Sequence, residues 1–363
     1  MRVAPPGLNR PWLFEVFPRL RQKLPWTPLV DAPTRVHRLE NVSAQLDREV
    51  WIKRDDKSAS EYGGNKPRKL EFILSEALDQ GRNRVVTGGG LGTNHGLATA
   101  IFGKKLGFRV TLGLFDQPVT AHVRKNLLLY QANGAEMIYM GSMLKAALRY
   151  YVIERVRRRD AFFIVVGGSS PLGVLGFVDA GLEFAIQVQR KEIPLPKVIF
   201  VAAGTCGTMA GLVLGLRLAG LRTRVLGVQV APGFVANPKA MIRLARKALK
   251  VMRRLDRSVP EVRLTLADFP MERGHYGPGY GHPTRVCRQA IQFMAESEAI
   301  FLDPTYTGKT FGALMEYGKS ETQGPVLFWN TLNSVDLSSV AESVDYRSLP
   351  EAFHRFFESD LVE

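Results

Sequence analysis

The sequence predicts an α/β protein with open parallel sheets and helices on both faces. Short apolar runs typical of buried strands recur between residues 84 and 330, and helical patterns lie between most of them. Strands and helices that alternate in this way form parallel sheets. Three strand-to-helix junctions are rich in glycine, namely 87–96, 166–173 and 202–211. Ligands of open α/β sheets bind at such junctions, so the three loops predict one binding site.

The expected elements follow in chain order. The first forty residues contain scattered prolines and are expected to lie over one lobe. A helix begins at Pro67, whose missing N–H costs nothing at the first helical position, and ends at Gly81. Further helices are expected over 119–133, 143–158 and 208–219, and a final amphipathic helix over 348–363. The expected strands are 84–88, 109–115, 136–140, 162–168, 197–204, 224–230, 299–303 and 326–330.

Composition restricts the class of protein. The chain has 363 residues, of which 45% are hydrophobic and 23% charged, as is ordinary for a soluble globular protein large enough for two lobes. Two cysteines, Cys206 and Cys287, cannot form a disulfide framework and indicate a reducing compartment. No apolar run looks long enough to span a bilayer, and the proline-containing start carries no export signal, so a cytoplasmic protein is expected.

The net charge of +15 allows attraction to polyanions. Much of the excess lies in two basic segments, 155–159 and 243–257. We interpret both as solvated faces of packed helices, because in the second segment the apolar residues form one helical stripe and most of the cations lie off it. That stripe consists of Leu244, Ala248, Val251 and Leu255. Without an RNA-binding signature, neither nucleic acid nor a membrane is an expected partner.

Several common site patterns fail in this sequence. The loop 87–96 has His95 where a dinucleotide fingerprint needs its third glycine. Residues 303–310 end like a phosphate-binding P-loop, but Asp303 stands at the opening glycine position. The six histidines show no metal-ligand spacing, and no G-x-S-x-G elbow is present. Nicotinamide redox chemistry, nucleotide hydrolysis, zinc chemistry and serine hydrolysis are therefore disfavoured.

Lys66 stands directly before the helix that begins at Pro67. The N-terminus of a helix carries positive potential, which disfavours a cation and favours the neutral amine that a Schiff base requires. An ordinary surface lysine near a helix start is the alternative. The compact loop 204–208 opens a second helix, and its N–H groups and two hydroxyls can surround one phosphate. The alternative there is a tight turn whose glycines allow close packing.

Six segments carry a specific resemblance. They are WIKRDDKSASEYGGNKPRKLEF (51–72), GLGTNHGLATA (90–100), AAGTCGTMAGL (202–212), GPGYGHP (277–283), FLDPTYTGKT (301–310) and VLFWNT (326–331). In this order they resemble the D-cysteine desulfhydrase and 1-aminocyclopropane-1-carboxylate (ACC) deaminase family of fold-type-II pyridoxal-phosphate (PLP) enzymes. The resemblance runs from about residue 28 to 336. It implies a two-lobed, tryptophan synthase β-like fold with a large PLP-binding domain (1–66 and 173–363), a small domain (67–172) and a homodimer.

The resemblance also implies roles for individual residues. Lys66 forms a Schiff base with the cofactor and moves a proton, and Asn94 hydrogen-bonds the cofactor's phenolic oxygen. Thr331 lies near the pyridine nitrogen, where a neutral hydroxyl makes the cofactor a milder electron sink that suits elimination. The phosphate is bound by Gly204, Thr205, Cys206, Gly207 and Thr208. The substrate carboxylate is received by Thr93, Asn94 and His95, and the active-site tyrosines are Tyr280 and Tyr306.

Purely structural roles stay open for some of these residues. Thr93 can cap the following helix, His95 can satisfy local backbone, and both tyrosines can be core aromatics. The family pattern also changes here. Thr93 stands where the family has serine, and the Asn330-Thr331-Leu332-Asn333 run stands where it has H-T-G-G.

Thr307 and Thr331 match the desulfhydrase branch, so β-elimination of D-cysteine, or of a related D-amino acid, to pyruvate, ammonia and sulfide is the expected reaction. ACC deamination, or another PLP-dependent β-elimination or β-replacement, is the alternative within the family. A low-turnover PLP-binding protein and a basic anion-binding protein are the alternatives of other classes.

Overall fold

The computed structural model describes residues 10–142, 160–318 and 324–361, which fold into two compact units. The first unit contains Met1–Phe72 and Ser169–Ser334, and the second contains Ile73–Gly168 and Val335–Glu363. The division based on the sequence kept residues 335–363 with the large domain. In the structure this segment packs on the second unit, where Lys125 Nζ donates to Ser338 Oγ over 2.8 Å and Arg124 Nε donates to the Phe356 carbonyl over 2.8 Å.

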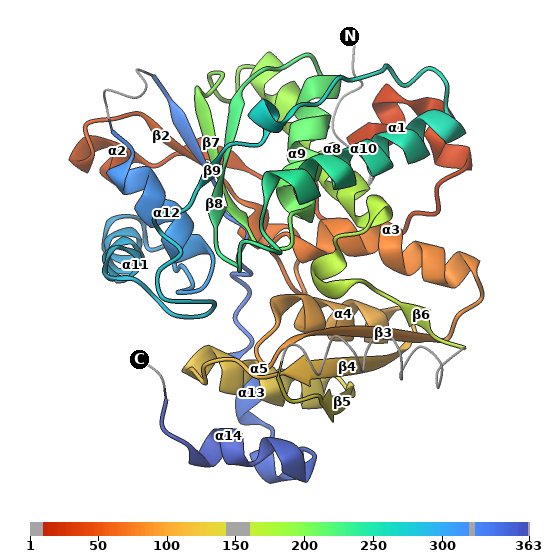
Figure 1. The fold of residues 1–363 in the computed structure, drawn as a ribbon, viewed down its shortest axis with the longest axis vertical. Helices are drawn as coiled ribbons and strands as arrows, with labels where there is room; N and C mark the ends of the chain where they lie inside the picture. The colour runs from red at the N-terminus through yellow and green to blue at the C-terminus, as the bar shows by residue number, and fades with distance from the viewer. Residues whose placement is uncertain (1–9, 143–159, 319–323, 362–363) are drawn as a thin grey trace. The chain divides into compact units, whose positions relative to one another are not determined.

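The first unit is built on a six-stranded sheet of order β1-β2-β10-β7-β8-β9. Figure 1 labels β2, β7, β8 and β9 of this sheet. All neighbours run parallel except β1 and β2. Because β2, β10 and β7 are parallel, their carboxyl ends meet at one edge of the sheet, where ligands bind in this class of fold. The strands are β1 (Val36–Arg38), β2 (Val50–Lys53), β7 (Val198–Ala203), β8 (Arg224–Gln229), β9 (Met271–Glu272) and β10 (Val326–Trp329).

Helices of the first unit bury apolar residues against both faces of this sheet, in two core clusters. The N-terminal segment joins the first cluster through Trp12, Leu13 and Phe14, so it packs into the core more deeply than its prolines suggest. The helices are α1 (Trp12–Val16), α2 (Glu40–Gln45), α3 (Lys66–Asp79), α8 (Pro171–Gln189), α9 (Gly207–Leu218), α10 (Pro238–Leu255), α11 (Arg285–Glu298) and α12 (Thr307–Glu316), with short 3-10 turns η1 (Pro18–Gln22), η2 (Asp55–Lys57) and η5 (Leu266–Asp268).

Helix α8 corrects one expectation. Within the described residues it is the one helix long and apolar enough to cross a membrane, whereas the sequence had indicated no such run. It is 78% buried inside the protein and packs against α9, so it is a core helix. A Cβ at Gly211 of α9 would lie 2.4 Å from the carbonyl oxygen of Val174 of α8, which explains why the contact requires glycine.

The second unit contains a parallel four-stranded sheet of order β5-β4-β3-β6. Helix α4 follows β3, and α5 follows β4, in the expected alternation. Its strands are β3 (Arg84–Gly90), β4 (Arg109–Phe115), β5 (Glu136–Tyr139) and β6 (Phe162–Phe163); its helices are α4 (Asn94–Lys105), α5 (Ala121–Ala132), α13 (Ser338–Glu342) and α14 (Arg355–Glu358), with 3-10 turns η4 (Val166–Gly168), η7 (Tyr346–Ser348) and η8 (Glu351–Phe353).

Most of the expected elements form, with exceptions. Of the expected strand 162–168 only Phe162–Phe163 pair, as β6, and Val166–Gly168 form the 3-10 turn η4. Residues 299–303 are not a strand, because Ala299 ends α11 in the left-handed conformation. Ile300 and Leu302 then enter the core without strand pairing, and Phe301 is exposed. The expected C-terminal helix is divided into η7, η8 and α14. The short strands β1, β2 and β9 carried too little pattern to be predicted. The expected helix 143–158 and the basic segment 155–159 lie outside the described residues.

Helix α10 carries the second basic segment. Its cations are exposed, as expected for a solvated face. Of the predicted apolar stripe only Ala248 is fully buried; the other three residues pack at the margin of the core. The centre of the buried face is rotated toward Met241, Ala245, Leu249 and Met252.

Candidate active site

Lys66 is the first residue of α3, and the loop before it passes between two other backbone segments. A Cβ at Gly63 would lie 1.9 Å from the Asp56 carbonyl oxygen. Gly64 has a φ of +89°, and a Cβ there would lie 2.7 Å from the Thr331 carbonyl oxygen. Only glycines allow this passage. The two glycines therefore seat the start of α3 directly against the residues that follow β10.

Asn65 connects Lys66 with two other predicted site residues. Its backbone N–H donates to the Thr331 carbonyl over 3.2 Å, and its side-chain Nδ2 donates to Thr208 Oγ1 over 3.0 Å. The first unit thus brings Lys66, the expected phosphate loop and Thr331 together around one residue. Asn333, which replaces a glycine of the family pattern, accepts from the Gly63 N–H over 2.7 Å and holds the same loop.

The environment of Lys66 favours its neutral form. Burial lowers the pKa of the Lys66 amine from 10.5 to about 8. Roughly a tenth of the amine is then deprotonated at pH 7, against fewer than one in a thousand for an ordinary lysine. The sequence predicted this direction from the helix N-terminus; the structure adds desolvation as its main cause.

The expected phosphate loop leads from β7 into α9. Ser169 Oγ hydrogen-bonds Thr205 Oγ1 over 2.7 Å and accepts from the Gly207 N–H over 3.2 Å. A Cβ at Gly207 would lie 2.6 Å from Ser169 Oγ and 3.2 Å from Lys69 Nζ. Glycine at this position lets Ser169 and Lys69 approach the start of α9, so that an N–H group, hydroxyls and an amine lie close together. These donors fit a phosphate monoester.

Cys206 contributes to this loop through its backbone. It caps α9 in the left-handed conformation, with a φ of +70°. Its thiol is directed at the carbonyl oxygens of Val235 and Asn237, at 3.2 and 3.8 Å. Burial raises the pKa of this thiol, so the side chain stays neutral. Both cysteines are free and buried.

Lys69 and Ser169 are residues that the sequence analysis missed. The loop 204–208 contains no cation, and dipoles alone seemed sufficient for a phosphate. In the structure α3 brings the Lys69 amine to the loop. Burial, and then the nearby charge of Lys66, lower the pKa of the Lys69 amine well below its ordinary value. The i, i+3 spacing from Lys66 was the available signal for Lys69, and Ser169 lies in one of the three glycine-rich junctions.

The two predicted tyrosines meet. The hydroxyls of Tyr280 and Tyr306 are 2.5 Å apart, and both rings are partly exposed rather than fully in the core. Tyr306 Cε1 lies 3.9 Å from where a Cβ of Gly204 would be, so the pair borders the phosphate loop. Burial raises the pKa of the Tyr280 hydroxyl, despite an opposing hydrogen bond from Tyr306. Tyr280 is therefore protonated at neutral pH.

The segment that resembles a P-loop holds these tyrosines in place. Asp303 accepts from the backbone N–H groups of Thr305, Tyr306 and Thr307 over 3.0, 2.9 and 2.8 Å. Lys309 Nζ donates to the Tyr276 carbonyl over 2.6 Å and thereby secures the loop that carries Tyr280. Asp303 at the position of the missing glycine thus has a structural purpose, which the sequence pattern alone did not reveal.

Thr93, Asn94 and His95 lie in the second unit. Thr93 caps α4 by accepting from the Gly96 N–H over 3.3 Å, so the structural role left open for it is confirmed. Its additional methyl group fits because residue 96 is glycine, where a Cβ would lie 2.5 Å from that methyl. His95 is buried in the first turn.

One face of α5 fixes this turn. Asn94 Oδ1 is 3.0 Å from His122 Nε2 and 3.3 Å from Asn126 Nδ2, and the Tyr130 hydroxyl donates to the Thr93 carbonyl over 3.0 Å. The sequence analysis missed these three α5 residues, although their i, i+4, i+8 spacing places them on one helical face.

The family model described as "Pyridoxal-phosphate dependent enzyme" matches residues 28–331 of the chain. The chain belongs to this family. Within it, the chain is 34% identical to a D-cysteine desulfhydrase of Serratia proteamaculans (strain 568), over 86% of this chain and 96% of that protein. It is 32% identical to a D-cysteine desulfhydrase of Klebsiella pneumoniae (strain 342), over 87% of this chain and 94% of that protein.

A solved structure agrees with these relatives. The crystal structure described as an ACC deaminase homologue matches with a TM-score of 0.75 at 32% identity, covering 87% of this chain and 94% of that chain. The chain is therefore a PLP-dependent enzyme of the D-cysteine desulfhydrase and ACC deaminase family, and the predicted family, α/β fold and cofactor are confirmed.

Proposed function

We propose that the enzyme is a lyase that converts D-cysteine and water to pyruvate, ammonia and sulfide. The observation that carries this proposal is that Asn65, the neighbour of Lys66, bonds both Thr208 of the expected phosphate loop and the backbone carbonyl of Thr331, so these three segments lie together. Thr307 and Thr331 favour the desulfhydrase branch. The identity of 32–34% to two desulfhydrases supports the same choice.

The chain's own residues supply binding and proton transfer in this proposal. PLP, when bound, acts as the electron sink that acidifies the substrate Cα–H bond. Lys69, Ser169 and the N–H groups at the start of α9 bind the phosphate. Lys66, whose amine has a pKa near neutral, would accept the Cα proton and then supply a proton to the departing sulfur. Thr331 would supply a neutral hydroxyl to the pyridine ring of the bound cofactor.

The tyrosine pair is assigned to the leaving group. A protonated phenol can donate a hydrogen bond to the sulfur as negative charge develops on it. Tyr280 and Tyr306 share one short hydrogen bond, so either hydroxyl is held in place while the other contacts the substrate. In the second unit, the N-terminus of α4 offers N–H groups to the substrate carboxylate, with Thr93, Asn94 and His95 in its first turn. Asn94 is also assigned to the phenolic oxygen of PLP.

An amino-acid panel tests the proposal. The purified holoenzyme is supplied with D-cysteine, L-cysteine, other small D-amino acids and ACC, and ammonia, sulfide and keto acid are measured. We expect sulfide and pyruvate in equal amounts from D-cysteine, and none from the Lys66→Ala variant. Oxobutyrate from ACC without sulfide release would instead identify an ACC deaminase, which the ACC deaminase homologue structure makes the second candidate. Bound cofactor with no product from any amino acid would identify a low-turnover PLP-binding protein.

The proposal includes a homodimer in the cytoplasm. Light scattering of the eluted holoenzyme should give about twice the chain mass of 40.4 kDa, and cell fractionation should recover the protein with cytoplasmic markers. A monomer at assay concentration, or recovery with membranes, would contradict this part of the proposal.

A further inference from the structure

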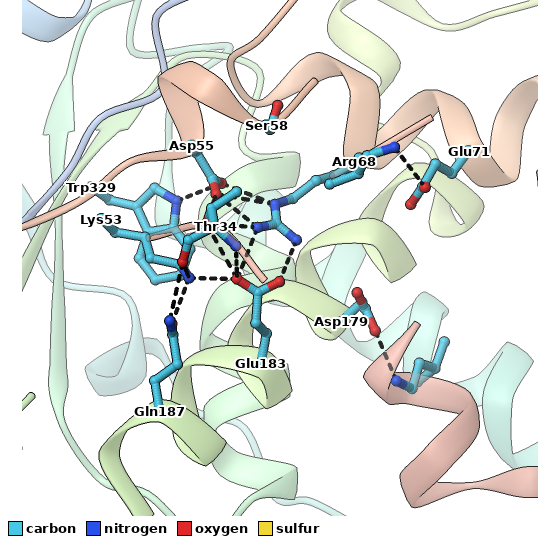
Figure 2. Close-up of polar contacts among 12 residues, drawn as sticks. Thr34, Lys53, Asp55, Ser58, Arg68, Glu71, Asp179, Glu183, Gln187 and Trp329 are labelled. Atoms are coloured by element: carbon cyan, nitrogen blue, oxygen red, sulfur yellow. Dashed lines mark hydrogen bonds and ion pairs between the residues drawn. The ribbon is translucent and has the colours of Figure 1, made fainter. Parts of the chain in front are cut away.

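A cluster of charged side chains lies buried beside the start of α3 (Figure 2). We call it the Arg68 cluster. Its members come from segments far apart in the sequence, and all of them are less than a tenth exposed. They are Thr34, Lys53, Asp55, Arg68, Glu183, Gln187 and Trp329.

All three guanidinium nitrogens of Arg68 donate hydrogen bonds. Its Nε lies 3.2 and 3.1 Å from the two oxygens of Asp55, and its Nη2 lies 2.8 Å from Asp55 Oδ1. Its Nη1 donates to Glu183 Oε2 over 3.0 Å, and its Nη2 also lies 3.1 Å from Thr34 Oγ1. A bidentate guanidinium permits one orientation of the side chain. The first turn of α3, which begins with Lys66 two residues earlier, is therefore held in one rotation.

The Asp55 carboxylate also accepts a hydrogen bond from a side chain of β10. Its Oδ2 accepts from Trp329 Nε1 over 2.7 Å, and Trp329 is the last residue of that strand, two residues before Thr331. The backbone carbonyl of Asp55 accepts from the Gly64 N–H over 2.7 Å. Asp55 thus contacts the segment of Lys66 by two routes and the segment of Thr331 by one.

The charges of the cluster balance. Two cations, Lys53 and Arg68, face two carboxylates, Asp55 and Glu183. Burial opposes ionisation of Glu183, but the Arg68 and Lys53 charges lower its pKa to about 2. Buried ion pairs often add no more stability than well-packed apolar residues of the same volume, so stability alone does not account for this arrangement. Its position between two site segments suggests a second purpose.

We propose that Asp55 is a positioning residue of the active site, whose carboxylate holds Lys66 through Arg68 and Thr331 through Trp329 in one fixed relation. This inference rests on the proposed function, because it assigns the amine and the hydroxyl to the same cofactor. Loss of the carboxylate should leave Arg68 and the Trp329 indole without their shared acceptor, and the two site segments should then move independently.

The test compares Asp55→Asn with two matched controls, Asp179→Asn and Glu71→Gln. All three carboxyl groups are buried, and Figure 2 draws the controls beside the cluster. Asp179 Oδ1 accepts from the Leu13 N–H over 2.8 Å, and Glu71 Oε1 accepts from the Leu29 N–H over 3.0 Å. Both control groups hold the N-terminal segment: Asp179 joins it to α8, and Glu71 joins it to α3 beyond the first turn. Neither is the acceptor that Arg68 and Trp329 share.

Two readouts separate positioning from stability. The first is the pH midpoint for chemical labelling of Lys66 in the apoprotein, followed by peptide mapping, which needs neither cofactor nor substrate. The second is the pH midpoint of the visible absorbance of the holoenzyme, together with kcat. For Asp55→Asn we expect both midpoints to shift by a full pH unit or more and kcat to fall at least tenfold. For both controls we expect midpoints within 0.3 unit of the unsubstituted enzyme, whatever the change in unfolding temperature.

Equal midpoint shifts in the controls would overturn the inference, as would an Asp55→Asn enzyme with unshifted midpoints and kcat within twofold. If Asp55→Asn does not fold, Trp329→Phe takes its place, since it removes one hydrogen bond and leaves the Arg68 ion pairs intact. That variant should lower kcat severalfold without moving the labelling midpoint of Lys66, and an unchanged kcat would count against the inference. Absence of visible absorbance in the unsubstituted holoprotein would instead defeat the proposed function, while the labelling result stands independently.

Discussion

Two faces of the first turn of α3 shift the pKa values of their basic side chains in opposite directions. Arg68 points into the Arg68 cluster, where carboxylates hold the pKa of its guanidinium above its ordinary value in spite of burial. Lys66 and Lys69 share another face of the same turn, and burial lowers the pKa of both amines. Adjacent residues of α3 therefore supply one charge that is fixed and two amines that can lose a proton.

The difference shows why the residue types are not interchangeable. A guanidinium stays protonated at any physiological pH, so it suits a permanent ion pair, whereas a buried lysine can become neutral and react. The Arg68 cluster, which forms the frame of the site, keeps its charges paired. The face of α3 that carries Lys66 and Lys69, which we call the chemical face, keeps amines that can lose a proton. Exchanging the two types should damage the enzyme in two distinguishable ways.

The largest effect is expected from breaking the frame with Arg68→Met. The substitution leaves Asp55 and Glu183 buried without the cation that they share, and uncompensated buried charge costs about 3–5 kcal/mol. Urea unfolding should show a loss of stability of this size. A loss below 1 kcal/mol would mean that the cluster has no dominant member and would remove the contrast between the two faces.

Two buried carboxyl groups, Glu71 and Glu183, extend this comparison to the pH dependence of stability. Burial raises the pKa of Glu71 to about 8, whereas beside Arg68 and Lys53 the pKa of Glu183 is about 2 despite burial. Folded Glu71 keeps a proton that the unfolded chain releases above 4.5, so its contribution to stability is lost as pH rises toward 8. Glu183 behaves oppositely, and its contribution is lost as pH falls from 4.5 to 2.

Glu71→Gln and Glu183→Gln should therefore change the pH dependence of the free energy of unfolding in different pH ranges. Each pH unit between 5 and 7 removes up to about 1.4 kcal/mol through Glu71, or about 3 kcal/mol over the range. Glu71→Gln should flatten this part of the stability profile, while Glu183→Gln should leave it intact and flatten the acidic limb. Identical slopes in the unsubstituted enzyme and Glu71→Gln would contradict the assignment.

The chemical face is tested by Lys69→Gln. Its amine lies beside the expected phosphate loop. A hydrogen bond to a charged group contributes about 1.5–3 kcal/mol. The dissociation constant of PLP should therefore rise roughly ten- to a hundredfold, measured by titration of the visible absorbance. Lys104→Gln, a substitution at an exposed lysine of α4, serves as the control. Equal affinity in Lys69→Gln and the control would remove Lys69 from the site.

The smallest effect is expected from Asn333→Gly, which restores the glycine of the family pattern. It removes the 2.7 Å hydrogen bond from the Gly63 N–H and should cost about 1 kcal/mol of stability. Thermal unfolding should show it, and the kcat for D-cysteine reports whether the looser loop still holds Lys66. An unfolding temperature at or above that of the unsubstituted enzyme would show that the loop is held by backbone alone.

The sequence predicted the parts of the site that lie in continuous motifs. Lys66, Gly204–Thr208 and Thr331 each stand at the end of a strand or the start of a helix, where glycine and proline patterns are informative. The partnership of Arg68 with Glu183 was invisible, because 115 residues separate them and no local pattern records a buried ion pair. Lys69 could have been found from its helical spacing. In the sequence, Asp303 indicated only that the P-loop pattern fails. Its structural role could not be predicted, because that role depends on the turn that it caps.

The fold shows the same division. Most strands of the two sheets were predicted, because the apolar runs that contain them are continuous in the sequence. Strand β9 has only two residues and β1 only three, so pairing rather than local pattern forms them. Residues 299–303 failed for the converse reason. Ile300 and Leu302 are buried by packing against the core without a neighbouring strand, while Phe301 is exposed.

The covalent role of Lys66 is tested most directly by borohydride reduction of the PLP-loaded enzyme, followed by proteolysis and mass spectrometry. Reduction converts a Schiff base to a stable amine, so the modified residue can be read from the peptide. The account predicts that the pyridoxyl mass is found on Lys66 and disappears in Lys66→Ala, while Lys69→Gln retains it at saturating PLP. A label on Lys69 or on any other lysine, or none at all with PLP bound, would contradict it.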